Sequence, residues 1–417
     1  MTHTPAIDVA VVGAGVVGLA TALHLTDAGR EVALIDPNEP GSGASYGNAG
    51  TLADYGCVPV GNPGVLRKLP RLLFDGDSPF SLRWAALSAL APWLIRFLRQ
   101  SGPGRARANA VALADLLGEA LPAWQELAAE ANVAALFRQN GCLYLFRGAG
   151  DFDDKALDHR LRAELGMRQQ VLNPAEVAAL EPALPPIAGH GVFFPDAVHV
   201  TDPAALTQAL HRVLEGRGTA LHRVAVSLLE AEPDGRIRLE GPGLSLLARN
   251  VVIAAGAWSR PLARQAGDRI PLDTERGYHL EFATPSPLLS RPVCPVELGF
   301  YLTPIQGRLR VAGTVELGGL RAPPNRRRLA LLERGARQLF PHLGAPSGEW
   351  LGFRPSMPDS LPVIGRSRAT PNLVYAFGHG HLGLTLAAVT GRLVAGLMNG
   401  RANSDRLAPF AAGRFHA

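Results

Sequence analysis

The sequence contains little cysteine. Its three cysteines, Cys57, Cys142 and Cys294, are far apart and none belongs to a CxxC pair. A disulfide scaffold or a zinc site is therefore not expected, and a reducing compartment fits this usage. His379 and His381 stand two residues apart on an expected loop, where their side chains would diverge, so we predict no metal site there.

Lysine is almost absent, although the chain is basic. It occurs only at positions 68 and 155, so arginine supplies 39 of the 41 basic residues behind the net charge of +5. No basic stripe interleaved with aromatic residues is present, and a nucleic-acid partner is therefore not expected. A basic surface that recruits anionic ligands or contacts a membrane stays open.

Long hydrophobic runs are also scarce. The run from Trp84 to Leu98 is broken by Pro92 and Arg96 and is too short to span a bilayer. The N-terminus lacks the basic region and cleavage site of a signal peptide. We therefore expect a cytoplasmic protein, and leave open a peripheral contact with the inner face of the cell membrane.

The composition is otherwise that of a folded chain. Apolar residues make up 47% of 417 residues, enough to build a core, and the length favours two domains. The 46 glycines and 34 prolines follow no three-residue period, so we expect them at turns and close backbone approaches.

The N-terminal region predicts a dinucleotide-binding βαβ unit. An apolar run at 7–12 suits a buried strand, GAGVVG at 13–18 matches GxGxxG, and a second strand at 31–35 ends at an acid. The three glycines would allow a tight turn, a close approach to pyrophosphate, and close helix–strand packing. The acid would bind a ribose hydroxyl and disfavour NADP. The predicted ligands are Gly13, Ala14, Gly15, Val16, Val17, Gly18 and Asp36.

The motif alone does not separate FAD from NAD, but three further segments favour FAD. Small residues at 41–51 suit a chain lying against a flat ring, and a strand with a small-residue turn at 250–259 could close over the pyrophosphate. A strand at 372–377 leads through glycines into a helix that runs to about Met398, whose N-terminus would stabilise negative charge on the reduced ring. The predicted contacts are Ser45, Asn48, Ala49, Gly50, Thr51, Ala255, Gly256, Trp258, Gly378, Gly380, His381, Leu382, Gly383, Leu384 and Thr385.

In this order the motifs resemble the FAD-dependent amine and amino-acid oxidoreductases of the D-amino-acid oxidase family. The likeness rests on SxxNAG at 45–50, AAGAWS at 254–259, GFRP at 352–355 and GHGHLGLT at 378–385, which together span nearly the whole chain. Within the family the chain is most similar to bacterial D-amino-acid dehydrogenases. Residues 274–280 and 354–365 resemble a branch that includes D-hydroxyproline dehydrogenases.

The resemblance implies an α/β plus α+β fold. A Rossmann-like FAD-binding domain of the glutathione-reductase type would be interleaved with a mixed-sheet substrate domain. We assign the FAD-binding domain to residues 1–60, 199–265 and 350–417, and the substrate-binding domain to 61–198 and 266–349. Helical insertions are expected near 81–135, and a strand at 223–229 would meet adenine near Val224.

Four residues are candidates for the chemistry. Arg354 matches the carboxylate-binding arginine of glycine oxidase by motif position, although a structural pair with Asp359 is an alternative. Tyr278 and Tyr301 could bond the carboxylate or cover the substrate, or else be core or surface tyrosines. His379 is expected to line the site near the ring.

The resemblance implies hydride transfer from the Cα of a D-amino or D-imino acid to flavin N5. No dedicated general base is required. Electrons would pass to a quinone or another carrier. A glycine, sarcosine or D-amino-acid oxidase that uses oxygen is one alternative, and a non-catalytic dinucleotide-binding protein is another.

Overall fold

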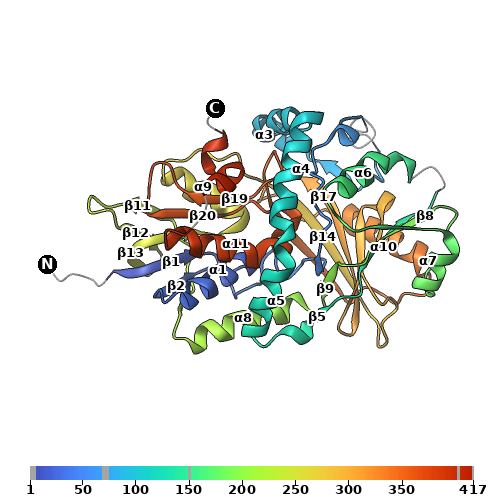
Figure 1. Ribbon diagram of the computed structural model, residues 1–417, viewed down its shortest axis with the longest axis horizontal. Helices are drawn as coiled ribbons and strands as arrows, with labels where there is room; N and C mark the ends of the chain where they lie inside the picture. Colours follow the sequence, from blue (N-terminus) through green and yellow to red (C-terminus); the bar gives the residue numbers. More distant parts are fainter. Residues whose placement is uncertain (1–5, 68–74, 149–151, 402–403, 416–417) are drawn as a thin grey trace.

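The computed structural model describes residues 6–67, 75–148, 152–401 and 404–415. Two β-sheets stand beside one another in Figure 1, and helices cover the sheet that carries the N-terminal strand. The chain crosses repeatedly between the two sheets, as the mixture of early and late colours in each of them shows. The site described below lies between them.

The first sheet carries the predicted nucleotide motifs. β10, β2, β1, β13 and β20 are parallel neighbours in this order, so their carboxyl ends meet at one edge. The strands predicted at 7–12, 31–35 and 372–377 are present within one residue. In the described part of the chain, this sheet consists of β1 (Ile7–Val12), β2 (Val32–Ile35), β10 (Ala220–His222), β11 (Leu228–Ala231), β12 (Ile237–Gly241), β13 (Leu244–Ile253), β19 (Val363–Arg366) and β20 (Leu373–Phe377).

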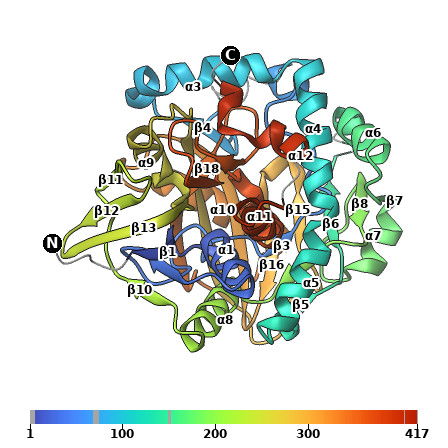
Figure 2. The same ribbon diagram turned by 60° about the vertical axis from the view of Figure 1, so that its left-hand side comes forward.

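Two apolar helices, α1 (Val16–Asp27) and α11 (Gly383–Met398), cross on one face of this sheet (Figure 2). They approach closely because Gly391 has no side chain: a Cβ there would lie 2.7 Å from the carbonyl oxygen of Ala20. The segment Gly380–Met398 is long and apolar enough to cross a membrane by length and composition. This segment packs against α1 and against α5 (Ala120–Glu130), so its apolar character reflects burial in the core.

The second sheet is mixed and stands opposite. Its order is β18, β14, β17, β16, β15, β6, β8 and β7, with β4 beside β17. Helix α10 (Arg326–Leu339) covers one face with an apolar stripe that reaches from Leu329 to Leu339. Within the described ranges its strands are β4 (Phe80–Leu82), β6 (Cys142–Phe146), β7 (Gln170–Leu172), β8 (His190–Phe194), β14 (Asp273–Ala283), β15 (Val293–Pro295), β16 (Phe300–Ile305), β17 (Arg308–Leu317) and β18 (Gly348–Ser356).

Helices α3 (Leu87–Gln100), α4 (Pro103–Gly118) and α5 (Ala120–Glu130) form the helical insertion expected near 81–135. A small sheet joins β3 (Thr51–Leu52), β9 (Val198–Val200) and β5 (Phe137–Arg138). Elsewhere in the described ranges the chain forms the α-helices α6 (Ala156–Glu164), α7 (Pro174–Leu180), α8 (Pro203–Gly216), α9 (Ser259–Gln265) and α12 (Ser404–Leu407).

The sheets divide the chain differently from the predicted domains in two places. Strand β18 falls largely in the segment assigned to the FAD-binding domain, yet it pairs with β14 in the second sheet. Helix α5 falls in the segment assigned to the substrate-binding domain, yet it packs on α11: the indole Nε1 of Trp124 donates to the carbonyl oxygen of Leu384 at 2.8 Å. Both placements depend on tertiary packing.

The strand predicted at 223–229 is wrong over most of its length. Strand β10 ends at His222, where the backbone N–H of Val224 turns back to the carbonyl oxygen of His222 at 3.0 Å. Strand β11 begins only at Leu228. The intervening loop therefore replaces the strand, although it still borders the site.

Candidate active site

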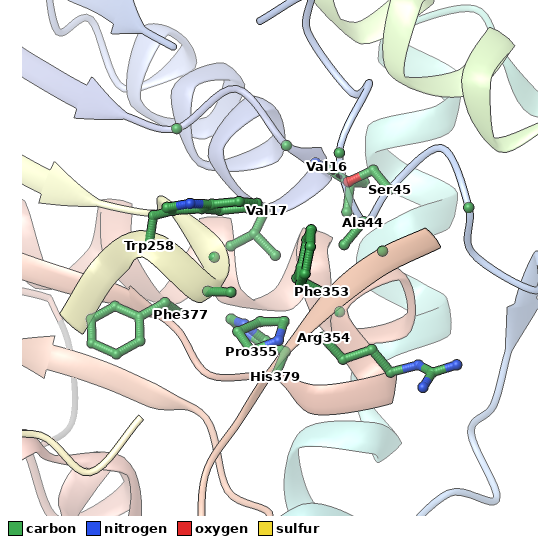
Figure 3. A pocket seen from close by; sticks show the side chains of 18 of the residues that line it. Val16, Val17, Ala44, Ser45, Trp258, Phe353, Arg354, Pro355, Phe377 and His379 are labelled. Carbon is green, nitrogen blue, oxygen red and sulfur yellow. Dashed lines mark hydrogen bonds between the residues drawn. The ribbon is translucent and has the colours of Figure 1, made fainter. Parts of the chain in front are cut away.

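A cavity of about 810 Å³ lies between the two sheets. One end is formed by the glycine-rich turn after β1 and by the end of β2; the other is formed by β14, β16, β17 and β18. Figure 3 shows part of its wall, where the start of α1, the turn after β13 and the strand β18 converge. The predicted nucleotide and substrate residues thus line one common cavity.

The glycine-rich turn has the geometry that the motif requires. Gly13 has a φ of +111°, and a Cβ there would lie 2.3 Å from the carbonyl oxygen of Ala254. At Gly18 a Cβ would lie 1.9 Å from the carbonyl oxygen of Gly13. The backbone N–H of Val16 donates to Ser45 Oγ at 2.9 Å (Figure 3). The turn therefore presents its backbone to the phosphate end of the cavity, and a side chain at Gly13 or Gly18 would collide with neighbouring backbone.

Asp36 closes this end. Its Oδ2 accepts a hydrogen bond from the backbone N–H of Ala14 at 2.8 Å, and its Oδ1 accepts one from Asn38 at 2.9 Å. The carboxylate is thus fixed beside the turn and still borders the cavity. Its contact with a ribose hydroxyl remains a prediction.

Arg310 binds the backbone of the 41–51 loop, which is predicted to contact the ring. The sequence did not predict this role. The guanidinium Nη1 of Arg310 donates to the carbonyl oxygens of Tyr46 at 2.7 Å and Asn48 at 2.8 Å. Nη2 of the same residue pairs with Glu281 Oε1 at 2.7 Å, and Arg310 is fully buried. An arginine among the apolar residues of β17 is the one sequence signal that could have indicated this role.

Within the loop, Asn48 Oδ1 accepts from the backbone N–H of Gly50 at 2.7 Å. Thr51 Oγ1 is buried and has no hydrogen-bond partner among the described residues, although Thr51 borders the cavity. Burying a hydroxyl without a hydrogen bond costs free energy. The Thr51 hydroxyl therefore suits a hydrogen bond to the polar edge of a ring bound in the cavity.

Most of the predicted cofactor residues border the cavity, and six do not. Those that border it include Val17, Ala49, Val224, Ala255, Gly256, Trp258, Gly380, His381, Gly383 and Leu384. Among the six, Ala14, Gly18 and Gly50 support the two loops, and Thr385 Oγ1 accepts from the backbone N–H of Ala53 at 3.0 Å. The remaining two, Gly378 and Leu382, pack behind the wall, Gly378 against Met357 and Leu382 in the core beside α11.

Arg354 lies in the wall of the second sheet and reaches across β14. Its Nη1 donates to the carbonyl oxygen of Thr314 on β17 at 2.9 Å, and its Nη2 contacts that of Gly313 at 3.4 Å. It passes over Gly277, where a Cβ would lie 2.3 Å from Arg354 Cζ. Asp359, the alternative partner, instead pairs with Arg414 at 2.8 Å. The guanidinium is therefore held by backbone at the cavity.

Two neighbours of Arg354 were not predicted. Glu275 borders the cavity on β14, and burial raises the pKa of its carboxyl while the charge of Arg354 opposes this rise. Thr314 has a φ of +57°, which is rare for a β-branched residue and is found mostly where surrounding structure imposes it. This conformation directs the Thr314 carbonyl to the guanidinium.

Tyr301 faces the cavity from β16 as part of a cluster of phenols. Its hydroxyl lies 2.7 Å from that of Tyr144 and 3.5 Å from that of Tyr55, which donates to Cys142 Sγ at 3.1 Å. Burial raises the pKa of the Tyr301 phenol, so it keeps its proton at neutral pH. When Tyr144 donates to Tyr301, the Tyr301 proton is available to a ligand.

Tyr278 does not present its hydroxyl to a ligand in the cavity, which corrects one of the two tyrosine predictions. The residue borders the cavity, but its hydroxyl donates to Glu316 Oε2 at 2.6 Å and accepts from the backbone N–H of Asn325 at 3.0 Å. Glu316 also pairs with Arg276 at 2.8 Å. This network lies on the α10 side of the sheet, so the phenol serves the core.

His379 borders the cavity beneath β18, and its Nε2 lies 2.9 Å from Thr390 Oγ1. Burial lowers the pKa of His379 to about 3, so the ring is neutral at physiological pH. The side chain of His381 borders the cavity. Desolvation, followed by the charge of Arg354, lowers the pKa of His381 to about 4. Among the described residues, no group of His, Cys, Asp and Glu could hold a metal ion.

Comparison with known proteins agrees with this geometry. Residues 8–397 match the family described as FAD dependent oxidoreductase, and the chain belongs to that family. It is 39% identical over 415 residues to a D-amino-acid oxidase of Bradyrhizobium diazoefficiens, covering 98% of both chains. It is 33% identical over 409 residues to a D-amino acid dehydrogenase of Paramagnetospirillum magneticum, covering 95% of this chain and 96% of the relative.

The fold is likewise shared. A glycine oxidase of Geobacillus kaustophilus superposes with a TM-score of 0.79 at 24% identity, covering 99% of each chain. An L-proline dehydrogenase from P. horikoshii superposes with a TM-score of 0.74 at 19% identity, covering 99% of this chain and 98% of the other. The protein is thus an FAD-dependent oxidoreductase, and the residues around the cavity fit FAD through the glycine-rich turn, the start of α11 and the unpartnered hydroxyl of Thr51.

Proposed function

We propose that this enzyme oxidises D-amino or D-imino acids and passes the electrons to a quinone or another carrier. The observation that carries the proposal is the guanidinium of Arg354, fixed by backbone carbonyls in the wall of the cavity that Tyr301 also borders. A planar cation and a phenol donor that line one cavity are suited to binding a substrate carboxylate. The names of the curated relatives support the substrate class.

The side chains divide the work of binding. Arg354 would hold the carboxylate, and Tyr301 would donate its hydroxyl proton to the same group. Glu275, which borders the cavity beside Arg354, offers a carboxyl group to the substrate amine. His379 stays neutral and contributes shape without adding charge. These residues orient the substrate, and orientation is a large part of the rate when the cofactor carries the redox step.

FAD, when bound, would supply the two-electron acceptor for the hydride that leaves Cα, and a C=N bond would form in the substrate. Water then hydrolyses an acyclic imine to a 2-oxo acid and ammonia, whereas a cyclic imino acid such as D-proline or D-hydroxyproline leaves as a cyclic imine. A neutral substrate amine provides the electron pair for the new C=N bond, so no protein base is needed.

An oxidase is the second candidate. It is favoured by the 39% identical relative from Bradyrhizobium, which is named a D-amino-acid oxidase. In that case oxygen would take the electrons and hydrogen peroxide would form.

The test is anaerobic reduction of the purified yellow enzyme, followed at the flavin absorption band. We expect bleaching by one or more of D-alanine, D-proline and D-hydroxyproline, and none by the L-isomers. Bleaching by L-isomers alone would contradict the substrate class. Admission of air then separates the two candidates, because rapid hydrogen peroxide release identifies the oxidase.

A further inference from the structure

The outer face of α3 is an exposed apolar stripe. Leu87, Ile95 and Leu98 are 37%, 50% and 42% exposed, whereas Leu90 and Trp93 on the opposite side are buried. At 100° per residue the three exposed side chains fall on one face of the helix. In Figures 1 and 2, α3 lies along the upper edge of the molecule, and its inner side packs on Leu317 of the second sheet. This face is therefore open to a partner.

Exposed arginines border the stripe. Arg96 Nη1 donates to the carbonyl oxygen of Pro92 at 3.2 Å, and Arg105 Nη1 donates to that of Arg99 at 3.2 Å. All three arginines are exposed, and within the described ranges none is paired with a carboxylate. The stripe and its border thus combine apolar side chains with positive charge that no described carboxylate neutralises.

We propose that this face, the α3 face, docks on the surface of an anionic lipid bilayer. An amphipathic helix with apolar residues on one side and arginines beside them lies in the interface, with its apolar face among the acyl chains and its cations at acidic headgroups. A second copy of the chain fits less well, because a two-fold contact through this face would bring the unpaired arginines of both copies together.

The α3 face is joined to the cavity by the inner side of the same helix. The Trp93 indole Nε1 donates to the carbonyl oxygen of Ser356 at 3.2 Å, two residues from Arg354 on β18. Phe97 packs at Gly61, where a Cβ would lie 3.0 Å from its ring, and the adjacent Val60 borders the cavity. Docking would therefore bring this wall of the cavity to the bilayer. The further idea that a quinone in the membrane accepts the electrons rests on the proposed function.

The experiment is flotation of the holoenzyme with phosphatidylcholine vesicles that contain or lack phosphatidylglycerol. We expect the enzyme to float with the anionic vesicles and to be released by high salt. The double variant Ile95→Glu/Leu98→Glu should lose flotation. The double variant Arg96→Gln/Arg99→Gln should bind about 25-fold more weakly, because each arginine contributes about fivefold at an anionic surface.

The matched control is Leu157→Glu/Val171→Glu, which adds the same charge at residues that are 59% and 54% exposed on α6 and β7. It should float like the parent enzyme. The proposal is overturned if the parent enzyme stays with the soluble fraction, or if the α3 variants float as it does. It is also overturned if Ile95→Glu/Leu98→Glu converts a soluble dimer into a monomer.

Activity with a soluble dye as acceptor is measured in parallel and should be equal in all four proteins. If D-amino acids fail to reduce the flavin, the proposed function fails while the flotation result stands. If reduction is normal and flotation is absent, only the docking proposal fails. Should the glutamate variants lose their flavin, the arginine-to-glutamine pair still decides, because those two side chains are exposed and make no core contact.

Discussion

Arg354 on β18 donates a hydrogen bond to the carbonyl oxygen of Thr314 on β17 at 2.9 Å, although β14 lies between these two strands. The guanidinium can cross because Gly277 has no side chain. The positive φ of Thr314 turns its carbonyl to meet it. One cation is thereby fixed at the cavity wall, and among the described residues no carboxylate is bonded to it, which leaves its charge for a ligand.

Replacing Arg354 with lysine tests this arrangement. Lysine keeps the charge but cannot form the planar, two-pronged contact, so we expect KM for a D-amino acid to rise about 30-fold or more, equivalent to about 2 kcal/mol. Flavin content should be unchanged. Anaerobic stopped-flow titration gives the substrate affinity directly. An unaltered KM in both Arg354→Lys and Arg354→Ala would contradict the assignment.

Gly277→Ala should displace the same guanidinium without altering its chemistry. The new Cβ would lie 2.3 Å from Arg354 Cζ, and such overpacking costs about 1–3 kcal/mol. We expect KM to rise about tenfold while flavin binding stays normal. Gly104→Ala on α4 is the control, because a Cβ there meets nothing within 4 Å. Steady-state kinetics of both variants, each checked for flavin content, make the comparison.

Arg310→Met should weaken flavin binding. The substitution removes both hydrogen bonds to the ring-contacting loop. Of the described cations it leaves buried Glu281 paired with Arg308 alone, at 3.3 Å. Breaking a buried pair costs about 3–5 kcal/mol. Flavin retention after dialysis and the fluorescence of released FAD measure the effect. Equal retention in the variant and the parent would show that the loop holds its shape without Arg310.

Tyr144→Phe should change substrate binding although Tyr144 does not border the cavity. Its hydroxyl lies 2.7 Å from that of Tyr301, and removing it frees Tyr301 to rotate or to turn its proton away. A hydrogen bond of this kind is worth about 0.5–1.5 kcal/mol, so we expect KM to rise about two- to tenfold with kcat nearly unchanged. A fall in kcat with an unchanged KM would show that the Tyr144 hydroxyl does not act through substrate binding.

Asp54→Asn should remove the loss of folding stability that occurs when the buried Asp54 carboxyl ionises as the pH rises. Burial, followed by the charge of Asp196, raises the pKa of Asp54 to about 6 from an ordinary value of 3.8. The folded state therefore favours the protonated carboxyl, and this contribution is complete below pH 3.8 and lost as the pH rises through 6. Above pH 6 the variant should be more stable by about 1–3 kcal/mol. Thermal unfolding at pH 4 and pH 8 measures the difference.

Much of the first sheet could be predicted from the sequence, because β1 and β20 are short apolar runs followed by a glycine, and β2 is one followed by Asp36. Gly13 needs its positive φ for the turn, and Gly18 needs to lack a side chain for packing. Such requirements are visible in the chain itself. The cavity-lining positions of the turn, of the loop before Thr51 and of the α11 start followed from them.

The second sheet could be predicted less well, because there the neighbours come from strand register. Tyr278 and Tyr301 look alike in the sequence, but the pairing of β14 with β17 shifts between Arg276 and Tyr278, so alternation does not give the face. The roles of Arg310, Gly277 and Tyr144 likewise depend on strands that are distant in the chain. Local patterns cannot supply such contacts.

Strand β13 lies between β1, from the very start of the chain, and β20, from near its end. A ribosome therefore finishes the glycine-rich turn long before the strand and helix that complete the cofactor site exist. The nascent enzyme must keep an unpaired strand edge until its last segment emerges, and it can take up FAD only after that. A truncation before Phe377 would accordingly remove the end of β20 and all of α11, and with them one wall of the cofactor site.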